Sequence, residues 1–224
     1  ITDTVEVKNH PGNYPVPVID FVSVNPGGHL IIEPGTALKS VGGYGIFVQG
    51  GRLSADDAVF TVAADDSIGG DNQNDGSDLT SLEDDRRAWN GMTLQSAADV
   101  TNCRFHYLRG PIDIYAQDVV LSGNDLRFES LGKATIPGQG TDSTSNTGIL
   151  IEEAGLGSKV TGNRLFDAAI RVNSNPGFDV FKGPYGVVAN NEILLSLTNV
   201  SGIYILNNSM TVTKNAISSY KKNS

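Results

Sequence analysis

The sequence predicts an all-β fold: a right-handed parallel β-helix, a solenoid of about eight or nine coils. Apolar runs of three to five residues recur along the chain, each followed within a few residues by Gly, Pro or Asn. Strands this short, separated by turns at nearly every step, are typical of solenoid coils rather than of sandwiches. No stretch keeps apolar residues at helical spacing over three turns, which argues against helices.

The first half of the chain shows the strands and turns most clearly. Prolines at 15 and 17 confine the first run to a sheet edge, because proline cannot donate to a strand ladder. Gly- and Pro-containing turns follow at 25–28, 33–36, 42–43 and 50–51. The predicted strands between and after these turns are 16–24, 29–32, 37–39, 45–48, 52–54 and 59–62.

A small unit repeats in the second half: Asn, one or two further residues, then an apolar residue. Asn tolerates the left-handed backbone of a tight corner. Asn side chains stacked coil above coil also hydrogen-bond along the stack. The unit therefore predicts corners at which Asn residues form a ladder. It occurs at 102–105, 122–126, 161–165, 190–193, 207–210 and 214–217.

These segments resemble secreted right-handed parallel β-helix repeat proteins of the pectate-lyase-like superfamily. The resemblance rests on the stretch 24–57, which includes 31–39, on the loop 65–76 followed by Trp89-Asn90-Gly91-Met92, and on 102–107. It covers nearly the whole chain and implies fold and secretion. It does not imply one activity, because this superfamily includes lyases, hydrolases, epimerases, adhesins and phage tailspikes.

The expected organisation is a single domain over 1–224. Residues 1–28 are predicted to be an N-terminal capping region, 64–88 an acidic Gly-rich insertion, and 132–147 a Gly/Ser/Thr-rich loop. The C-terminal residues show no capping helix, and an uncovered coil is an open sheet edge. We therefore expect the chain either to continue in a longer protein or to assemble with another copy.

Composition limits the possible partners. The formal net charge of −9 disfavours binding to nucleic acid. No apolar segment is long enough to span a membrane. Cys103 is the single cysteine, so the chain holds no internal disulfide. It reads as a small buried hydrophobe, the alternative being a reactive thiol. An extracellular or cell-surface location is expected.

The acidic insertion is the candidate metal site. Its carboxylates lie among glycines, a composition that can wrap around a hard cation such as calcium. The candidate ligands are Asp66, Asp71, Asp75 and Asp78. Gln73 and Leu82 depart from the pattern of an EF-hand loop, so calcium binding would need a different closure. The alternative is a solvated acidic loop that binds no metal.

Catalytic signals are weaker. Arg104 and His106 alternate on one face of a predicted strand and are the candidates for lyase chemistry; the alternative is an exposed polar face. Paired-carboxylate hydrolysis has seven candidate acids, and no pair of them forms an active-site motif. These acids are Asp113, Asp118, Asp125, Glu129, Glu152, Glu153 and Asp167.

Aromatic residues are candidates for sugar contacts, the alternative being core packing. They are Tyr107, Tyr115, Phe128, Phe166, Phe178, Phe181 and Tyr185. The expected function is an extracellular module for binding, adhesion or assembly, with a polysaccharide or a cell-surface protein as partner. The alternatives are a lyase or hydrolase acting on acidic polysaccharide, and a tailspike-like trimer that binds a receptor.

Overall fold

The computed structural model describes residues 1–8, 16–41, 45–70, 89–108, 110–128, 147–152, 157–173, 186–195, 202–206 and 210–219. Their strands form three parallel sheets, here called A, B and C. Sheet A holds β1 (Thr4–Val7), β4 (His29–Ile32), β7 (Arg52–Asp56), β10 (Ala98–Thr101), β13 (Val119–Ser122), β16 (Lys159–Thr161), β19 (Val187–Ala189) and β22 (Thr211–Thr213).

Sheets B and C complete each coil. Sheet B holds β2 (Val18–Ile19), β5 (Ala37–Ser40), β8 (Val59–Val62), β11 (Arg104–Leu108), β14 (Asp125–Phe128), β17 (Arg164–Phe166), β20 (Glu192–Leu195) and β23 (Ala216–Ser219). Sheet C holds β3 (Val22–Val24), β6 (Ile46–Val48), β9 (Met92–Leu94), β12 (Ile112–Ile114), β15 (Thr147–Ile151), β18 (Ala169–Asn173) and β21 (Ile203–Leu206).

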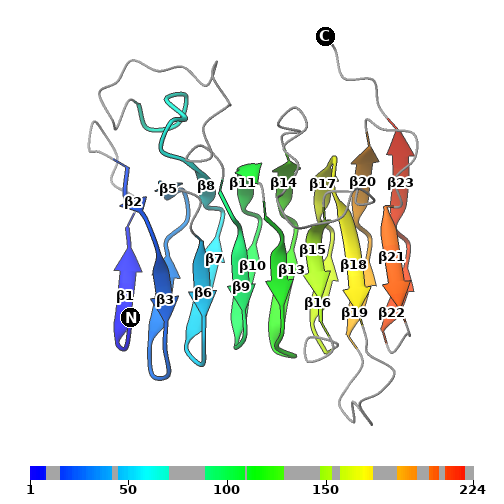
Figure 1. Cartoon of the computed structure of the whole chain (residues 1–224), viewed down its shortest axis with the longest axis horizontal. Helices are drawn as coiled ribbons and strands as arrows, with labels where there is room; N and C mark the ends of the chain where they lie inside the picture. Colours follow the sequence, from blue (N-terminus) through cyan, green and yellow to red (C-terminus); the bar gives the residue numbers. More distant parts are fainter. Residues whose placement is uncertain are drawn as a thin grey trace, which may run out of the picture.

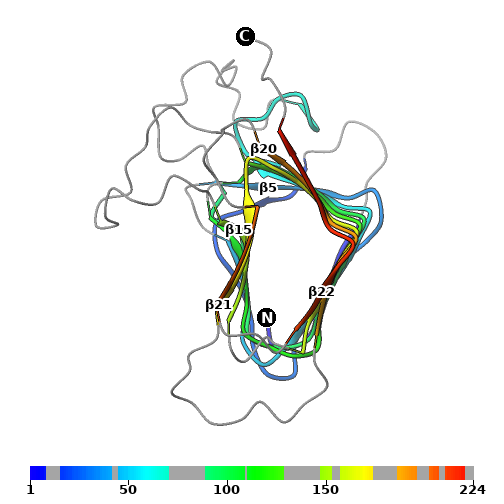
Figure 2. The same cartoon turned by 90° about the vertical axis from the view of Figure 1, so that its right-hand side faces the viewer.

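The chain visits sheets A, B and C in turn, and each strand pairs with the strand three places later. Figure 1 shows the coils stacked side by side, and Figure 2 shows the three-sided cross-section. The described strands build eight coils, the last of them from β22 and β23. The predicted right-handed parallel β-helix is confirmed. The described residues contain no helix that is long and apolar enough to cross a membrane.

Alternation along each strand builds the core. Every second side chain points inward, so one inward position repeats in register from coil to coil. On sheet A one such column is fully or almost fully buried. It consists of Ile32, Ala55, Val100, Leu121, Val160 and Val188. This strict register holds the outward side chains of each sheet in equally straight rows.

The run predicted as one strand over 16–24 is two strands. β2 pairs with β5 in sheet B, and β3 pairs with β6 in sheet C. The chain bends at Asp20 and passes through Phe21 between them. The apolar run continues across the bend because both strands contribute to the same core, which hides the corner from sequence patterning. Residues 1–28 thus supply the strands of the first coil.

The corner between sheets A and B carries the Asn ladder. Asn124, Asn163, Asn191 and Asn215 stack in successive coils, and each of the first three donates from Nδ2 to the Oδ1 of the next at 2.8–3.0 Å. The predicted ladder is confirmed for these four residues. The left-handed backbone, however, belongs to the preceding residue. It is found at Gly35, Asp57, Asn102, Gly123, Gly162, Asn190 and Lys214. The unit at 207–210 lies largely outside the described residues.

An aromatic stack fills the core of the third and fourth coils. Phe60 and Phe105 are adjacent in sheet B, with ring centroids 4.7 Å apart and nearly parallel planes. Trp89 lies parallel to both, at 5.2 Å from Phe60 and 5.7 Å from Phe105. All three are buried. Large rings at one level therefore contribute apolar volume where the neighbouring coils use aliphatic side chains.

At both ends of the described stack of coils, side chains are exposed at positions that are buried in the neighbouring coil. Ile217 is 53% exposed, although Ile193, its partner in the preceding coil, is fully buried. At the other end Val5 is exposed, although its partner Leu30 is buried. Continuation of the chain, or assembly with a second copy, would cover these side chains and stays a prediction.

Candidate functional site

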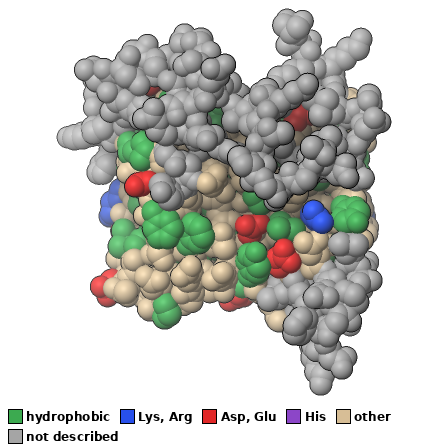
Figure 3. All heavy atoms as spheres, in the orientation of Figure 1, with side chains coloured by type: hydrophobic (Ala, Val, Ile, Leu, Met, Phe, Trp, Pro, Cys, Tyr) green, Lys and Arg blue, Asp and Glu red, His purple; other side chains and the backbone are tan. Residues whose placement is uncertain are grey.

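The outward row of sheet C is the most chemically varied surface that the structure describes. Strict register aligns one outward side chain from each coil along the stack. From the first to the seventh coil they are Ser23, Phe47, Thr93, Asp113, Leu150, Arg171 and Tyr204. Tyr115 and Glu152 directly follow β12 and β15, and Asn173 is the last residue of β18; each comes two residues after an outward residue and lies on the same side of the sheet. We call these ten residues the sheet C face, and Figure 3 views the molecule from this side.

Aromatic rings occupy both ends and the middle of this face. At the N-terminal end the rings of Phe21 and Phe47 lie 5.1 Å apart, and Phe21 is 53% exposed. Tyr115 is 37% exposed and Tyr204 is 45% exposed. Exposed rings on a rigid sheet offer flat apolar surfaces for a ligand, since no described element covers them. The rings belong to the second, fourth and seventh coils, with Phe21 beside the first.

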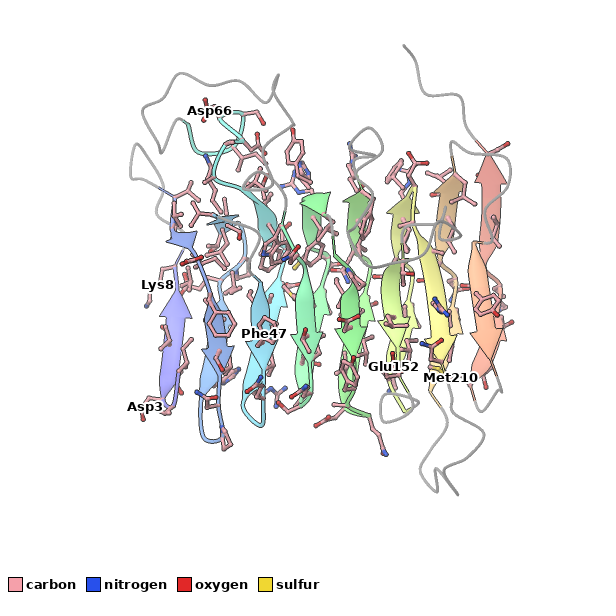
Figure 4. All side chains as sticks on the ribbon, viewed as in Figure 1. Asp3, Lys8, Phe47, Asp66, Glu152 and Met210 are labelled. Atoms are coloured by element: carbon pink, nitrogen blue, oxygen red, sulfur yellow. The ribbon has the colours of Figure 1, made fainter. Side chains whose placement is uncertain are left out.

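Two carboxyl groups lie in the middle of the face, on neighbouring strands. Asp113 is paired with Leu150, and the backbone N–H of Glu152 donates to the carbonyl of Ile114 at 2.9 Å. Asp113 and Glu152 are therefore diagonal neighbours, with Cα atoms about 8 Å apart from standard sheet spacings. Figure 4 shows Glu152 on the same face as Phe47.

The environment of Asp113 favours its protonated form. Its Oδ1 is buried and has no hydrogen-bond partner among the described residues. Burial, and secondly the charge of Glu152, raise the pKa of Asp113 from 3.8 to about 6. Burial and these same two carboxylates also raise the pKa of Tyr115. Asp113 and Tyr115 belong to one coil, and Glu152 belongs to the next coil on the same face.

Glu152 is oriented by a chain of contacts from the next two coils. Asn173 donates from Nδ2 to Glu152 Oε1 at 3.4 Å, and its Oδ1 accepts from Arg171 Nε at 3.1 Å. The guanidinium of Arg171 lies over the ring of Tyr204, with Cζ 5.4 Å from the centroid. Residues of three coils thus help to position the carboxylate of Glu152. Arg171, the cation of the sheet C face, is held beside the ring of Tyr204 at the C-terminal end of this face.

Connections from sheet B to sheet C carry both long insertions. The acidic insertion 64–88 falls between β8 and β9, and the loop 132–147 leads from β14 into the start of β15. Tight glycine packing occurs next to these connections. A side chain on Gly45 would overlap Gly91, and one on Gly91 would overlap Pro111. The connections that join sheet C to its neighbours thus vary in length, whereas the A-to-B corner has two residues between its strands in every coil from the third to the eighth.

Arg104 and His106 lie on the outer face of sheet B, not with the carboxyl pair. They share one side of β11, as predicted. Strict alternation would place Leu108 on that side too, but it lies on the other. Tyr107 has a φ of 56° at a register shift, so Leu108 turns inward and is buried. Burial, and secondly the charge of Arg127, lower the pKa of His106. The charges of Asp65 and Asp125 act in the opposite direction, but they do not outweigh burial and the arginines.

The other charges on sheet B largely neutralise one another. Arg127 donates to Asp125 at 3.0 Å, and Arg164 pairs with Glu192 at 2.9 Å. Both arginines lie over the ring of Phe166, each Cζ being 5.0 Å from the centroid. Phe166, a predicted sugar-binding aromatic, is therefore covered by its own neighbours.

The predicted calcium ligands are only partly described. Asp66 lies in a half-buried turn after β8, far from the sheet C face (Figure 4). Asp71, Asp75 and Asp78 lie outside the described residues. Among the residues that are described, no group of three or more His, Cys, Asp or Glu side chains is placed to hold a metal ion. Calcium binding by this loop stays a prediction.

Asp65, next to Asp66, has a structural role. It is fully buried, and its Oδ2 accepts from the hydroxyl of Thr61 at 2.6 Å. Its Oδ1 accepts from the backbone N–H and the hydroxyl of Ser67. Nearby, the buried Lys39 donates from Nζ to the carbonyl of Gly70 at 2.7 Å. These bonds fix the start of the acidic insertion against sheet B.

Sequence reasoning named Asp113, Glu152 and Tyr115 but did not group them. Asp113 and Glu152 are separated by 39 positions, and the loop between them has no fixed length in a solenoid. A local signal did exist: Asp113 is flanked by Ile112 and Ile114, both fully buried, as expected of an outward acid on a core strand. Phe47 and Tyr204 were missed because their outward positions depend on register.

No protein-family profile, curated protein or solved structure matches this chain. The fold and the site therefore define its class: a parallel β-helix protein with a rigid outward face that combines aromatic rings and carboxyl groups. Membership of the pectate-lyase-like superfamily remains a resemblance.

Proposed function

We propose that the chain is an extracellular binding module that holds an extended polysaccharide along the sheet C face. The observation that carries this proposal is the set of aromatic rings on this one face, the exposed Tyr115 and Tyr204 and the half-buried Phe47, with hydrogen-bonding side chains between them. Sugar rings have an apolar face that stacks on aromatic rings and hydroxyl groups that bond to polar side chains.

The geometry of the solenoid supports an elongated ligand. Successive coils repeat every ~4.8 Å, close to the length of one sugar unit in an extended glycan. A chain laid along the axis would meet one outward side chain per coil. It would contact Phe47 in the second coil, Asp113 and Tyr115 in the fourth, and Tyr204 in the seventh. A rigid sheet orders these contacts before binding, which lowers the entropic cost of association.

Charge favours a neutral glycan. The middle of the face holds Asp113 and Glu152, and the chain as a whole carries a net charge of −9. A polyanion would be repelled by both. The cation of the face, Arg171, is already bonded to Asn173 and stacked on Tyr204. We therefore propose neutral polysaccharides as ligands and treat acidic ones as the comparison.

Affinity electrophoresis in gels containing soluble polysaccharide tests the proposal. Xyloglucan, mixed-linkage glucan and glucomannan serve as neutral ligands, with polygalacturonate and alginate as acidic ones. The parent is expected to be retarded by at least one neutral polymer. Tyr115→Ala and Tyr204→Ala should reduce that retardation, because each removes an exposed ring. Lys159→Ala, at an exposed outward position of sheet A, is the matched control and should migrate like the parent.

Two results would overturn the proposal. One is migration unaffected by all five polysaccharides. The other is retardation that persists in the Tyr115→Ala/Tyr204→Ala double variant, which would place the binding surface elsewhere. Retardation by the acidic polymers alone would contradict the charge argument and would favour an acidic polysaccharide as ligand.

A further inference from the structure

Asp113 and Glu152 form an asymmetric pair on a surface that the proposed function assigns to a glycan. They are diagonal neighbours on β12 and β15, and both are half-buried. One oxygen of Asp113 is buried without a partner, whereas Glu152 accepts a hydrogen bond from Asn173. Two nearby carboxyl groups in different environments are the arrangement that separates an acid from a base.

The surroundings of the pair support this division of roles. Thr93 of β9 and Leu150 of β15 lie directly beside Asp113 in the outward row. Tyr115 lies two residues further along the chain, Glu152 lies diagonally just after β15, and Arg171 of β18 lies two strands away. None of them donates a hydrogen bond to the buried oxygen. Glu152, in contrast, is held by Asn173, whose own amide is held by Arg171. The first carboxyl group is set to keep a proton, and the second is oriented to accept one.

We propose that Asp113 and Glu152 are the general acid and general base of a glycoside-hydrolysing site. This inference rests on the proposed binding of a neutral polysaccharide to the sheet C face. Asp113 gives its proton to the glycosidic oxygen as the bond from that oxygen to the anomeric carbon breaks. A water molecule attacks the anomeric carbon, and Glu152 takes the proton that this water loses.

The step balances without any further reactant. One water is consumed, one C–O bond breaks and one forms, and two shorter chains result, one with a new hydroxyl group and one with a new reducing end. Asp113 is left ionised and Glu152 protonated, and proton exchange with solvent restores both. Tyr115 and Tyr204 would act as binding residues on either side of the reacting bond, and Asn173 as the positioning residue for Glu152.

The pH profile follows from the acid. Asp113 must be protonated to act, and burial and Glu152 raise its pKa to about 6. Turnover is therefore expected to fall as pH rises through about 6. A purely structural role for Asp113 would not produce this descending limb in the rate.

The experiment measures new reducing ends released from each neutral polysaccharide, between pH 4 and pH 8. The parent should release reducing ends most rapidly below pH 6. Asp113→Asn and Glu152→Gln should each slow the release by roughly 10²–10⁴-fold, while both remain retarded in the affinity gels. Asp99→Asn, which replaces a carboxylate on the outer face of sheet A, should keep the parent rate. Melting curves confirm that the variants are folded, and the pH profile of the parent needs no variant.

The outcomes separate this inference from the proposed function. A parent that is retarded by a polysaccharide but releases no reducing ends from any of them overturns hydrolysis and leaves binding intact. Absence of both retardation and release overturns both. Release that is unchanged in Asp113→Asn or Glu152→Gln overturns the assignment of the pair.

Discussion

Asn163 donates from Nδ2 to the Oδ1 of Asn191 at 3.0 Å, and its backbone N–H donates to the same oxygen at 2.9 Å. A second Nδ2 bond, to the carbonyl of Leu121 at 3.0 Å, reaches back to the preceding coil. One side chain therefore joins three coils. Because Asn163 is fully buried, each of these polar groups depends on the ladder for its partner.

Replacing Asn163 by Ala is expected to destabilise the fold strongly. The Leu121 carbonyl and the backbone and side-chain N–H groups of Asn124 would lose their partners inside the core. Unpaired buried groups cost about 1–3 kcal/mol each, so a loss of at least ~3 kcal/mol is expected. Thermal unfolding measures it, at about 2–4 °C per kcal/mol for a chain of this size. Asn215→Ala, at the last and partly exposed rung, should cost clearly less. Equal losses of stability in Asn163→Ala and Asn215→Ala would contradict the view that a buried rung of the ladder stabilises the fold more than the partly exposed last rung.

Cys103 occupies the rung before Asn124, so Cys103→Asn is expected to extend the ladder. The backbone N–H of Cys103 already donates to Asn124 Oδ1 at 2.9 Å, as the Asn residues do in later coils. By the same pattern, a new Nδ2 would reach Asn124 Oδ1 and the carbonyl of Ala55. The variant should melt at or above the parent temperature. Cys103→Leu, which adds volume and no donor, should melt lower. If Cys103→Leu melted at a higher temperature than Cys103→Asn, position 103 would not be equivalent to the Asn positions of the ladder.

The thiol of Cys103 is expected to be unreactive in the folded chain. It is fully buried, and burial is the main cause that raises its pKa to about 12. Because the thiolate is the reactive form, a disulfide reagent at pH 8 should label almost no folded protein. It should label one thiol per chain after unfolding. Rapid labelling of folded protein would instead support the reactive thiol considered from the sequence.

Sequence patterning could predict the solenoid because the strands are short and the Asn-containing corner between sheets A and B repeats. The strand His29–Ile32 and the strand Val59–Val62 were predicted with their observed bounds. The candidate site was harder to predict, since it depends on which outward residues share a row. Asp113 and Glu152 meet through register across a long loop, and the register shift at Tyr107 reverses the side on which Leu108 lies. The periodicity of residues within one strand predicts neither that Asp113 and Glu152 are neighbours nor that Leu108 points inward.

Gly91 is expected to tolerate no side chain. Its φ is +83°, and a Cβ would overlap the carbonyl oxygen of Pro111 in the next coil. Gly70 provides a matched control: its φ is +77°, but nothing lies within 4 Å of its Cβ position. Gly70→Ala should cost about 1–2 kcal/mol from backbone strain alone. Gly91→Ala should cost more than ~3 kcal/mol. Similar melting temperatures for the two variants would contradict close packing at the edge of sheet C.

Stability should depend on pH through Asp113. The pKa of this carboxyl group rises from 3.8 to about 6 on folding, so between these values the folded chain keeps a proton that the unfolded chain has lost. The free energy of unfolding contributed by Asp113 is therefore fully present below about pH 4, falls as pH rises, and is lost above about pH 6. Asp113→Asn removes this dependence.

Melting temperatures of parent and variant at pH 4 and pH 7 measure the effect. Relative to the parent, Asp113→Asn should be more stable at pH 7 than at pH 4, by about 1 kcal/mol after allowance for solvent screening. Glu152→Gln removes the second cause of the raised pKa but leaves burial, so it should weaken the pH dependence without abolishing it. A stability difference between parent and Asp113→Asn that is the same at both pH values would show that folding does not perturb this carboxyl group. The acid role proposed for Asp113 would then lose its electrostatic basis.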